Sequence, residues 1–185
     1  MFKRYNQLVL KRPLVTNMVT TGILFGTGDC LAQKFFPEHE NSTYDYQRSL
    51  RSIIYGTLIF APMGDKWYKF INTVKSPIRS SNGNINKYLD VVTRVAGDQL
   101  VFAPFVGIPM YYTMMTFMEF SSNPLDDIKR KLNNSLWPTL KTNWLVWPAF
   151  QMLNFSLIPV QMRLLSVNVV SIGWNCYLSY IHNKK

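Results

Sequence analysis

The sequence is poor in the residues that build catalytic and metal sites. It has two Cys and two His in 185 residues. A structural zinc site of the usual four ligands would use every one of them, and two Cys cannot form the disulfide framework of a small secreted protein. The chain also has no Gly-rich phosphate loop, no GxSxG and no HExxH motif, so catalysis has no candidate constellation. We therefore expect no enzyme activity, no cofactor and no metal.

Charge is scarce as well, and acidic charge most of all. Charged residues make up 16% of the chain, against about 25% in an ordinary soluble domain. Only 10 Asp and Glu stand against 20 Lys and Arg, which gives a formal net charge of +10. Nucleic acid is a common partner for a basic chain, but here the aromatic residues lie apart from the basic ones. We therefore expect no nucleic-acid partner and assign the basic loops to anionic lipid headgroups.

The chain does have long segments without a single charge. They are residues 13–28, 52–64, 99–118, 142–162 and 164–181. Two of them are about 20 residues long, the length that a helix needs to cross roughly 30 Å of hydrocarbon. The charges lie between the segments, as in a multi-pass membrane protein. A soluble helical bundle is the alternative, and a mean hydropathy of −0.02 favours it. The length of the uncharged segments argues against it.

We therefore predict an all-α fold, a polytopic transmembrane helix bundle that forms a single membrane domain over residues 1–185. The expected apolar helices are about 14–34, 51–72, 95–118, 143–162 and 164–181. Only residues 159–163 separate the last two helices, which could form a tight hairpin, a bent pair, or one span followed by an interfacial helix. The prediction is thus four spans, with a fifth apolar helix as a further candidate.

Polar side chains recur inside these apolar segments, where each needs a partner or a water-filled space. Gly22, Gly26, Asp29 and Gln33 are spaced by four, three and four residues and share one helix face. The two glycines on that face would let another helix approach closely. The candidate interior-facing or pore-facing residues are Asp29, Gln33, Asp98, Gln151, Asn154, Arg163 and Asn175. They either hold helices together by hydrogen bonds or line an aqueous path.

Two smaller expectations concern counter-ions and cysteines. The acids available in the helices are Asp29, Asp65 and Asp98, and the basic residues considered as their partners are Lys66, Lys69 and Arg163. Cys30 and Cys176 lie within apolar helices, and both are expected to be small buried hydrophobes.

The C-terminal segment from Trp147 to Ser179 reads WPAFQMLNFSLIPVQMRLLSVNVVSIGWNCYLS. It follows the pattern WPxxQxxNFxxVPxxxR and then WNxYLS, with Ile158 in place of the Val. Residues 98–104 also fit a DQxxxAP pattern. In these motifs the chain resembles the Mpv-seventeen and twenty-two-kilodalton peroxisomal membrane protein family, which includes Sym-one-like proteins. It departs from the family at Ala61 and Asp65, where the family has Gly and His.

The resemblance implies an integral membrane protein, usually with four spans, of the mitochondrial inner membrane or the peroxisomal membrane. Some family members are channels for small solutes. We therefore expect a self-associating, weakly selective pore for small solutes or metabolites in an organelle membrane. The alternative is a structural or adaptor membrane protein with no transport activity. The four basic residues and no acid within residues 1–28 favour the mitochondrial inner membrane over the peroxisomal membrane.

Overall fold

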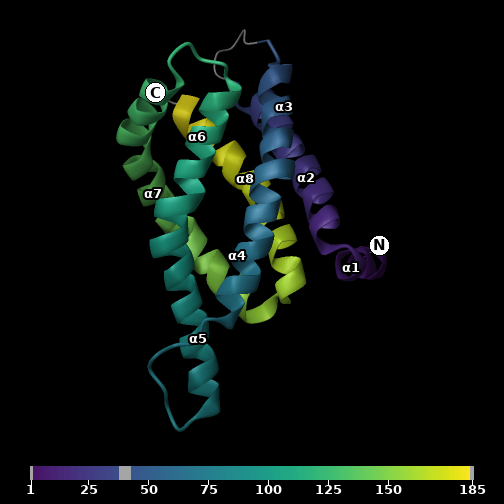
Figure 1. Cartoon of the computed structure of the whole chain (residues 1–185), viewed down its shortest axis with the longest axis vertical. Coiled ribbons are helices and arrows are strands. Elements are labelled where there is room, and N and C mark those ends of the chain that lie inside the picture. The colour runs from purple at the N-terminus through teal and green to yellow at the C-terminus, as the bar shows by residue number, and fades with distance from the viewer. Residues whose placement is uncertain (1, 38–42, 184–185) are drawn as a thin grey trace. The chain divides into compact units, whose positions relative to one another are not determined.

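The computed structural model describes residues 2–37 and 43–183, and these residues form helices and connecting loops with no strand. Figure 1 shows the elements in chain order. The expected all-α fold is confirmed. The chain divides into two compact units, one built from residues up to Tyr68 and from Gln161 onward, the other from Lys69–Val160. That the whole chain acts as a single membrane domain stays a prediction.

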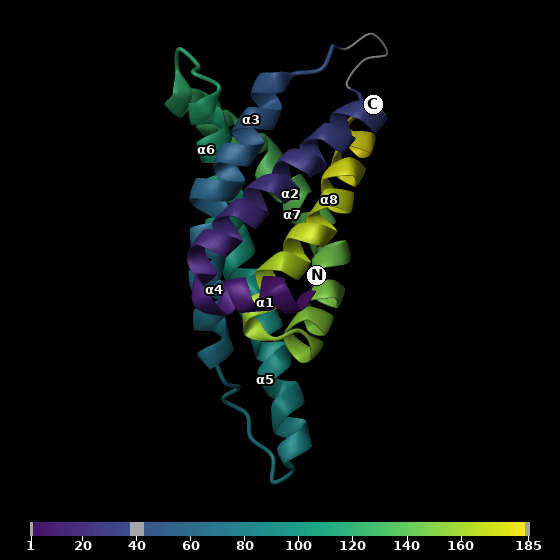
Figure 2. The same cartoon turned by 90° about the vertical axis from the view of Figure 1, so that its right-hand side faces the viewer.

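The first unit is organised around one long helix. Its elements are α1 (Phe2–Lys11), α2 (Pro13–Phe35), α3 (Tyr46–Ile54), η1 (Tyr55–Phe60), the first part of α4 (Ala61–Thr73) and α8 (Val160–Asn183). α2 packs antiparallel to α3 and η1, and α8 runs alongside α2 (Figure 2). Small residues make the first of these contacts close. A Cβ added at Gly22 would lie 2.1 Å from Thr57 Oγ1, and one at Gly26 would lie 2.6 Å from Ile53 Cγ1. The spacing of these glycines predicts this close approach.

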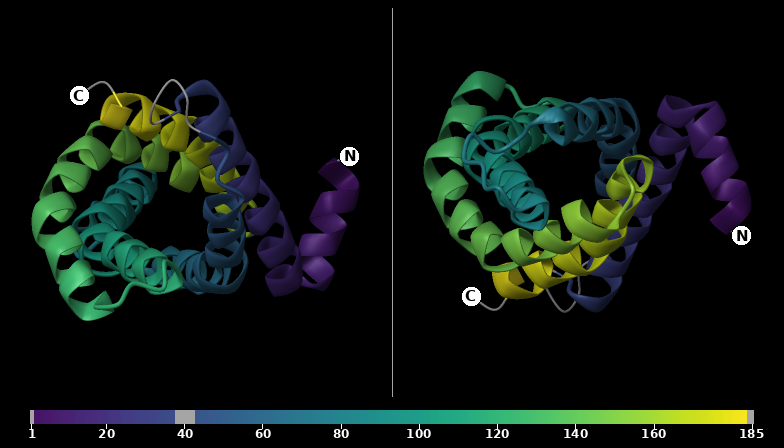
Figure 3. Two further views of the ribbon diagram at one scale, coloured as in Figure 1. Left: turned by 90° about the horizontal axis from the view of Figure 1, so that it is seen from above. Right: turned by 90° about the horizontal axis from the view of Figure 1, so that it is seen from below.

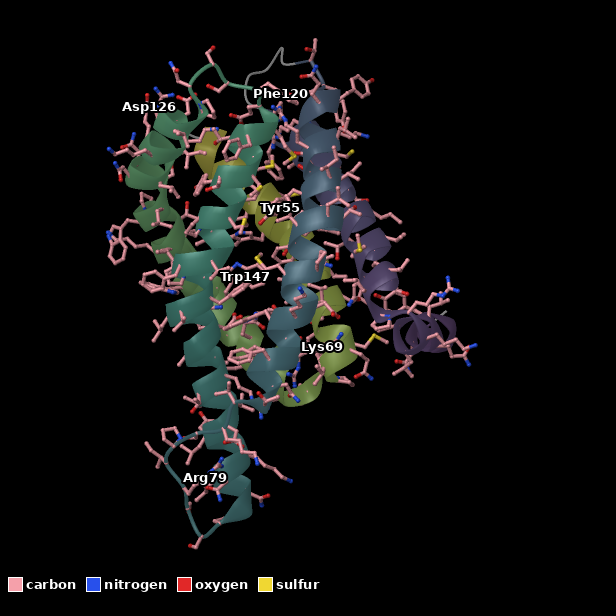
Figure 4. The ribbon with its side chains drawn as sticks, viewed as in Figure 1. Tyr55, Lys69, Arg79, Phe120, Asp126 and Trp147 are labelled. Atoms are coloured by element: carbon pink, nitrogen blue, oxygen red, sulfur yellow. The ribbon has the colours of Figure 1, made fainter. Side chains whose placement is uncertain are left out.

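The second unit pairs two long helical segments. Its elements are the end of α4, α5 (Gly83–Gly97), η2 (Asp98–Gly107), α6 (Ile108–Met118) and α7 (Pro124–Leu157). α5, η2 and α6 run on without a break and pack antiparallel to α7. Two hydrogen bonds show this antiparallel order. Gln99 bonds to Trp144, and Tyr112, which comes later than Gln99, bonds to Thr139, which comes before Trp144. Arg79 and Phe120 lie at opposite ends of this pair (Figure 4).

Both units contain a wide helical turn of the π type. The N–H of Ala61 donates to the carbonyl of Gly56, and the N–H of Ile108 donates to the carbonyl of Ala103. In each case the acceptor lies five residues before the donor. Pro104 lies inside η2, and Pro62 follows η1. Proline has no N–H, and in an α-helix its ring clashes with the carbonyl four residues earlier. A wider turn, in which hydrogen bonds join residues five apart, accommodates the proline at these points.

The helices extend beyond the uncharged segments that predict them. The third expected helix begins at Gly83 instead of about 95, because the Asn82 side chain caps it by accepting the Asn84 N–H at 2.9 Å. The fourth begins at Pro124 instead of about 143, with proline in its first turn, where the missing N–H costs nothing.

The boundary between the last two helices also differs from the expectation. α7 ends at Leu157 because Ile158, which precedes a proline, is extended with φ −94° and ψ 127°. Arg163 therefore belongs to the first turn of α8 and not to the connection.

By length and composition, one helix among the described residues is suited to crossing a membrane. It is the continuous run of 36 residues from Gly83 to Met118, and only 11% of its apolar window is buried inside the structure. The core helix of a soluble protein would be mostly buried. The four-span arrangement as a whole stays a prediction.

The cap on α5 gives a first test of the local structure. Asn82→Ala removes the acceptor for the Asn84 N–H and should lower the free energy of unfolding by about 1 kcal/mol. Asn84→Ala is the matched control, because its exposed side chain makes no capping bond and Ala favours a helix. Denaturant unfolding in detergent micelles measures both. Equal losses for the two variants would contradict the capping role.

Candidate functional site: two buried carboxylate clusters

Asp29 is the centre of a buried polar network in the first unit. Its side chain is almost fully buried, and three donors reach its carboxylate. Arg48 Nε donates to Oδ1 at 2.8 Å, while Ser49 Oγ and Gln33 Nε2 donate to Oδ2 at 2.6 and 2.7 Å. We call these four residues the Asp29 cluster. Arg48 also forms an ion pair with Asp29, so the carboxylate has its positive partner within the unit.

Local structure at the start of α3 holds the donors in place. Asp45 caps this helix by accepting the Arg48 N–H at 2.9 Å. Gln33 fixes the cap in turn, because its Oε1 accepts the Asp45 N–H at 2.8 Å and its Nε2 donates to the Asp45 carbonyl at 3.0 Å. The end of α2 and the first turn of α3 are therefore tied together on both sides of the carboxylate.

A hydroxyl and a thiol extend this network toward solvent. Tyr44 OH lies 2.6 Å from Ser49 Oγ and 2.7 Å from Cys30 Sγ. The hydrogen bond to Cys30 raises the pKa of Tyr44 above its ordinary value. Cys30 itself is exposed and Cys176 is half-buried, so the expectation of two buried thiols is wrong. Cys30 follows the inward-facing Asp29 by about 100° around α2 and therefore falls beside the buried face.

A second set of polar bonds joins α2 to other helices of the same unit. Asn17 Nδ2 donates to Asp65 Oδ1 at 3.0 Å, and Asn168 Nδ2 donates to Thr21 Oγ1 at 2.7 Å. Asn17, Thr21 and Asn168 are all buried. The inner face of α2 is thus polar over much of its length.

Asp98 is the centre of the corresponding network in the second unit. Its Oδ2 accepts from Gln99 Nε2 at 2.7 Å and from Gln151 Nε2 at 2.9 Å. Asn154 Nδ2 donates to Gln151 Oε1 at 2.9 Å, which orients the Gln151 amide. We call Asp98, Gln99, Gln151 and Asn154 the Asp98 cluster. All four are at most 5% exposed, and Asn154 is at 0%.

Two residues of α7 anchor this cluster from one side. Asn143 Nδ2 donates to Gln99 Oε1, and Trp144 Nε1 donates to the Gln99 carbonyl, both at 2.9 Å. Gln99 therefore has its amide oxygen, amide nitrogen and main-chain carbonyl all bonded. The arrangement is a rigid chain of amides that ends on one carboxylate.

The structure brings the expected site residues together in two groups. Asp29 and Gln33 meet in the first unit, and Asp98, Gln151 and Asn154 meet in the second. The other two expected residues lie on α8: Arg163 is 5% exposed, and Asn175 is half-buried with its amide beside Gly28. That any of these residues lines an aqueous path stays a prediction.

Sequence reasoning missed several members of these groups. The counter-ion of Asp29 is Arg48, not Lys66, Lys69 or Arg163. The other missed residues are Asn17, Thr21, Ser49, Gln99 and Asn143. The sequence places Arg48 three residues after Asp45, a residue type that caps helices, and so in the first turn of a helix, but no spacing connects it to Asp29.

The distribution of side chains is the reverse of that in a soluble protein. Large apolar side chains are exposed along the helices that bury the clusters, for example Ile23 at 62%, Phe105 at 75% and Leu145 at 81%. Among the residues whose burial the structure describes, as many polar as apolar side chains are buried. Water rarely faces so much apolar surface on a monomeric soluble protein, whereas lipid does. Among the described residues, no three His, Cys, Asp or Glu lie close enough to hold a metal ion.

Comparison with known proteins agrees with this picture. The Mpv17 / PMP22 family model matches residues 116–179. Protein SYM1 of Candida albicans is 56% identical over 100% of this chain and 98% of its own length. Protein SYM1 of Debaryomyces hansenii is 53% identical over 100% of the chain and 89% of its own, and that of Saccharomyces cerevisiae is 50% identical over 97% and 89%. No solved structure matches the chain. The chain therefore belongs to the Mpv17/PMP22 family of organelle membrane proteins.

Proposed function

We propose that the chain is a polytopic protein of an organelle membrane, with four spans, that forms a weakly selective pore for small solutes or metabolites. The observation that carries the proposal is the combination of exposed apolar side chains with buried carboxylate and amide groups on the same helices. A pore in a membrane needs both features, because lipid requires an apolar outer surface and water requires a polar inner one.

The Asp98 cluster is the better candidate for the wall of such a pore. An acid at membrane depth is costly and is found mainly where a partner or a solute path compensates it. The amides of Gln99 and Gln151 approach one oxygen, Asp98 Oδ2, from two helical segments. Amide and carboxylate groups suit small polar solutes because they offer both donors and acceptors. A carboxylate in the wall would also favour cations over anions.

The Asp29 cluster favours the second candidate function, a structural or adaptor membrane protein. Its carboxylate accepts from a guanidinium, a hydroxyl and an amide, and the charge of Arg48 balances its own. A cluster of this kind, which ties the end of α2 to the start of α3, holds helices together. The two clusters can serve the two roles in one protein, with Asp29 in assembly and Asp98 in conduction.

The proposal includes the partners and the location of the protein. The partners are the lipid bilayer, with anionic headgroups at the basic loops, small solutes, and further copies of the chain. The acid-free basic segment over residues 1–28 supports the mitochondrial inner membrane over the peroxisomal membrane. The protein acts by passage of solutes and not by a chemical step.

Solute release from vesicles tests the proposed activity. Purified protein is reconstituted into vesicles that contain a mixture of small uncharged solutes and a large dextran. We expect the small solutes to leave and the dextran to stay, because a weakly selective pore sorts by size. The control is an equal amount of protein denatured before reconstitution. Retention of every solute by vesicles that hold folded, inserted protein would support the structural alternative.

A further inference from the structure

The N-terminal helix α1 is separated from α2 by a sharp bend of the backbone. It ends at Lys11, and the backbone then bends at Arg12, with φ −140° and ψ 69°, before Pro13 begins α2. The residue before a proline avoids the helical conformation, so the bend is built into the sequence. Figures 2 and 3 show α1 running across the axis of α2 instead of along it.

The side chains of α1 are distributed as in a helix at a membrane surface. Val9 faces the rest of the unit and is 1% exposed. Leu8 and Leu10 flank it by about 100° on either side. They remain 56% and 64% exposed. An isolated exposed Leu needs no explanation, but here Leu14 at 44% continues the apolar surface beyond the bend.

Basic residues border this apolar surface. Lys11 and Arg12 are exposed next to the leucines. Lys3 and Arg4 belong to the same helix, and no acidic residue precedes Asp29 in the sequence. Apolar residues beside basic ones, with no acid, are complementary to an anionic lipid surface, where the aliphatic part of a lysine or arginine can lie along lipid while its charge reaches phosphate.

We propose that α1 is an interfacial helix that lies in the headgroup layer of a leaflet containing anionic lipid. Leu8 and Leu10 enter the boundary of the acyl chains, and Lys11 and Arg12 bind lipid phosphates. The inference rests on the proposed function, because α1 can lie along the membrane surface only if α2 crosses the membrane. It adds a specific element and a lipid class to that proposal.

The experiment uses the full chain with Cys30→Ser and Cys176→Ser as background. One variant carries a fluorophore at Leu10→Cys on α1, and a second carries it at Ile23→Cys, an exposed position within α2. Both are reconstituted in phosphatidylcholine vesicles with a minor fraction of phosphatidylglycerol. An aqueous quencher reports depth. Energy transfer to headgroup-labelled phosphatidylglycerol or phosphatidylcholine reports which lipid gathers at α1.

We expect the Ile23 label to be shielded from the quencher and the Leu10 label to be partly shielded. Each basic residue near an anionic surface is favoured about fivefold, so transfer from Leu10 to labelled phosphatidylglycerol should exceed transfer to labelled phosphatidylcholine severalfold. Lys11→Gln with Arg12→Gln should bring that ratio close to one. The matched control, Lys87→Gln with Lys129→Gln, removes the same charge from exposed positions elsewhere and should leave the ratio unchanged.

The two proposals fail in different ways. A shielded Ile23 label with a fully quenched Leu10 label, or with equal transfer to the two lipids, would overturn the interfacial role of α1 and leave the membrane span of α2 intact. An Ile23 label as accessible as in water would overturn the membrane proposal itself.

Discussion

Replacing Asp29 with Ala should lower the free energy of unfolding by about 3 kcal/mol. The carboxylate is 6% exposed and accepts from Arg48, Ser49 and Gln33. Its removal takes an acceptor from a guanidinium, a hydroxyl and an amide at once and breaks the ion pair with Arg48. The loss therefore comes from three hydrogen bonds and an ion pair and not from one bond. Reversible unfolding of the purified protein in mixed micelles measures it.

Two further variants sharpen this prediction. Asp29→Asn keeps one carbonyl oxygen as an acceptor but places an amide NH2 group opposite the donors. Its free energy of unfolding should therefore lie between that of the original chain and that of Asp29→Ala. Asp126→Ala removes an exposed carboxylate in the first turn of α7 and should cost less than about 1 kcal/mol. If Asp29→Ala were as well tolerated as Asp126→Ala, the Asp29 cluster would have no structural role.

Gly26→Leu should be at least as damaging, with a loss of about 3 kcal/mol in the free energy of unfolding or failure to fold. A Cβ at this position would lie 2.6 Å from Ile53 Cγ1 and 3.0 Å from Ile53 Cδ1, well inside contact distance. The larger side chain would force α2 and α3 apart, and the bonds from Arg48 and Ser49 to Asp29 would break with them. Gly26→Ala should cost less, because the Ile53 side chain can shift in part.

Gly173 supplies the matched control. It also lies inside a helix, α8, but a Cβ there would meet no atom within 4 Å. Gly173→Ala should be neutral or stabilise the protein by up to about 1 kcal/mol, because Ala favours helix more than Gly does. Thermal unfolding in micelles compares the pair. A loss at Gly173 equal to that at Gly26 would mean that close packing is not the reason for the effect.

The features that sequence analysis predicted well depend on local periodicity. The positions of Gly22, Gly26, Asp29 and Gln33 on one face follow from the helical repeat alone, and the structure packs that face against α3 and η1. The grouping of Gln151 with Asn154 is of the same kind, since residues three apart on a helix are neighbours.

Helix ends were predicted poorly because hydropathy detects apolar segments and not helices. α5 and α7 start at Gly83 and Pro124, well before the uncharged segments, where a cap and a proline define the ends. Those local signals are in the sequence, but they lie in polar stretches that a search for membrane spans passes over.

Partners across helices were the hardest to predict. Arg48 is 19 residues from Asp29, and no local spacing connects them. Gln99 was missed because neighbours i and i+1 in a helix do not normally face each other. Its amide nevertheless reaches Asp98 at the start of η2, while Asn143 and Trp144 hold its other groups. Such contacts depend on how helices pack and on where a helical turn widens.

The central claim is that buried carboxylate and amide groups border a path for small solutes, and single-channel recording in planar bilayers tests it most directly. We predict discrete openings from the purified protein. Asp98→Asn should lower its preference for cations over anions severalfold, because the variant removes the charge of the Asp98 cluster but keeps its shape. Asp126→Asn, an exposed change of the same charge, should leave that preference as it is. No openings from protein shown to be folded and inserted would contradict the claim.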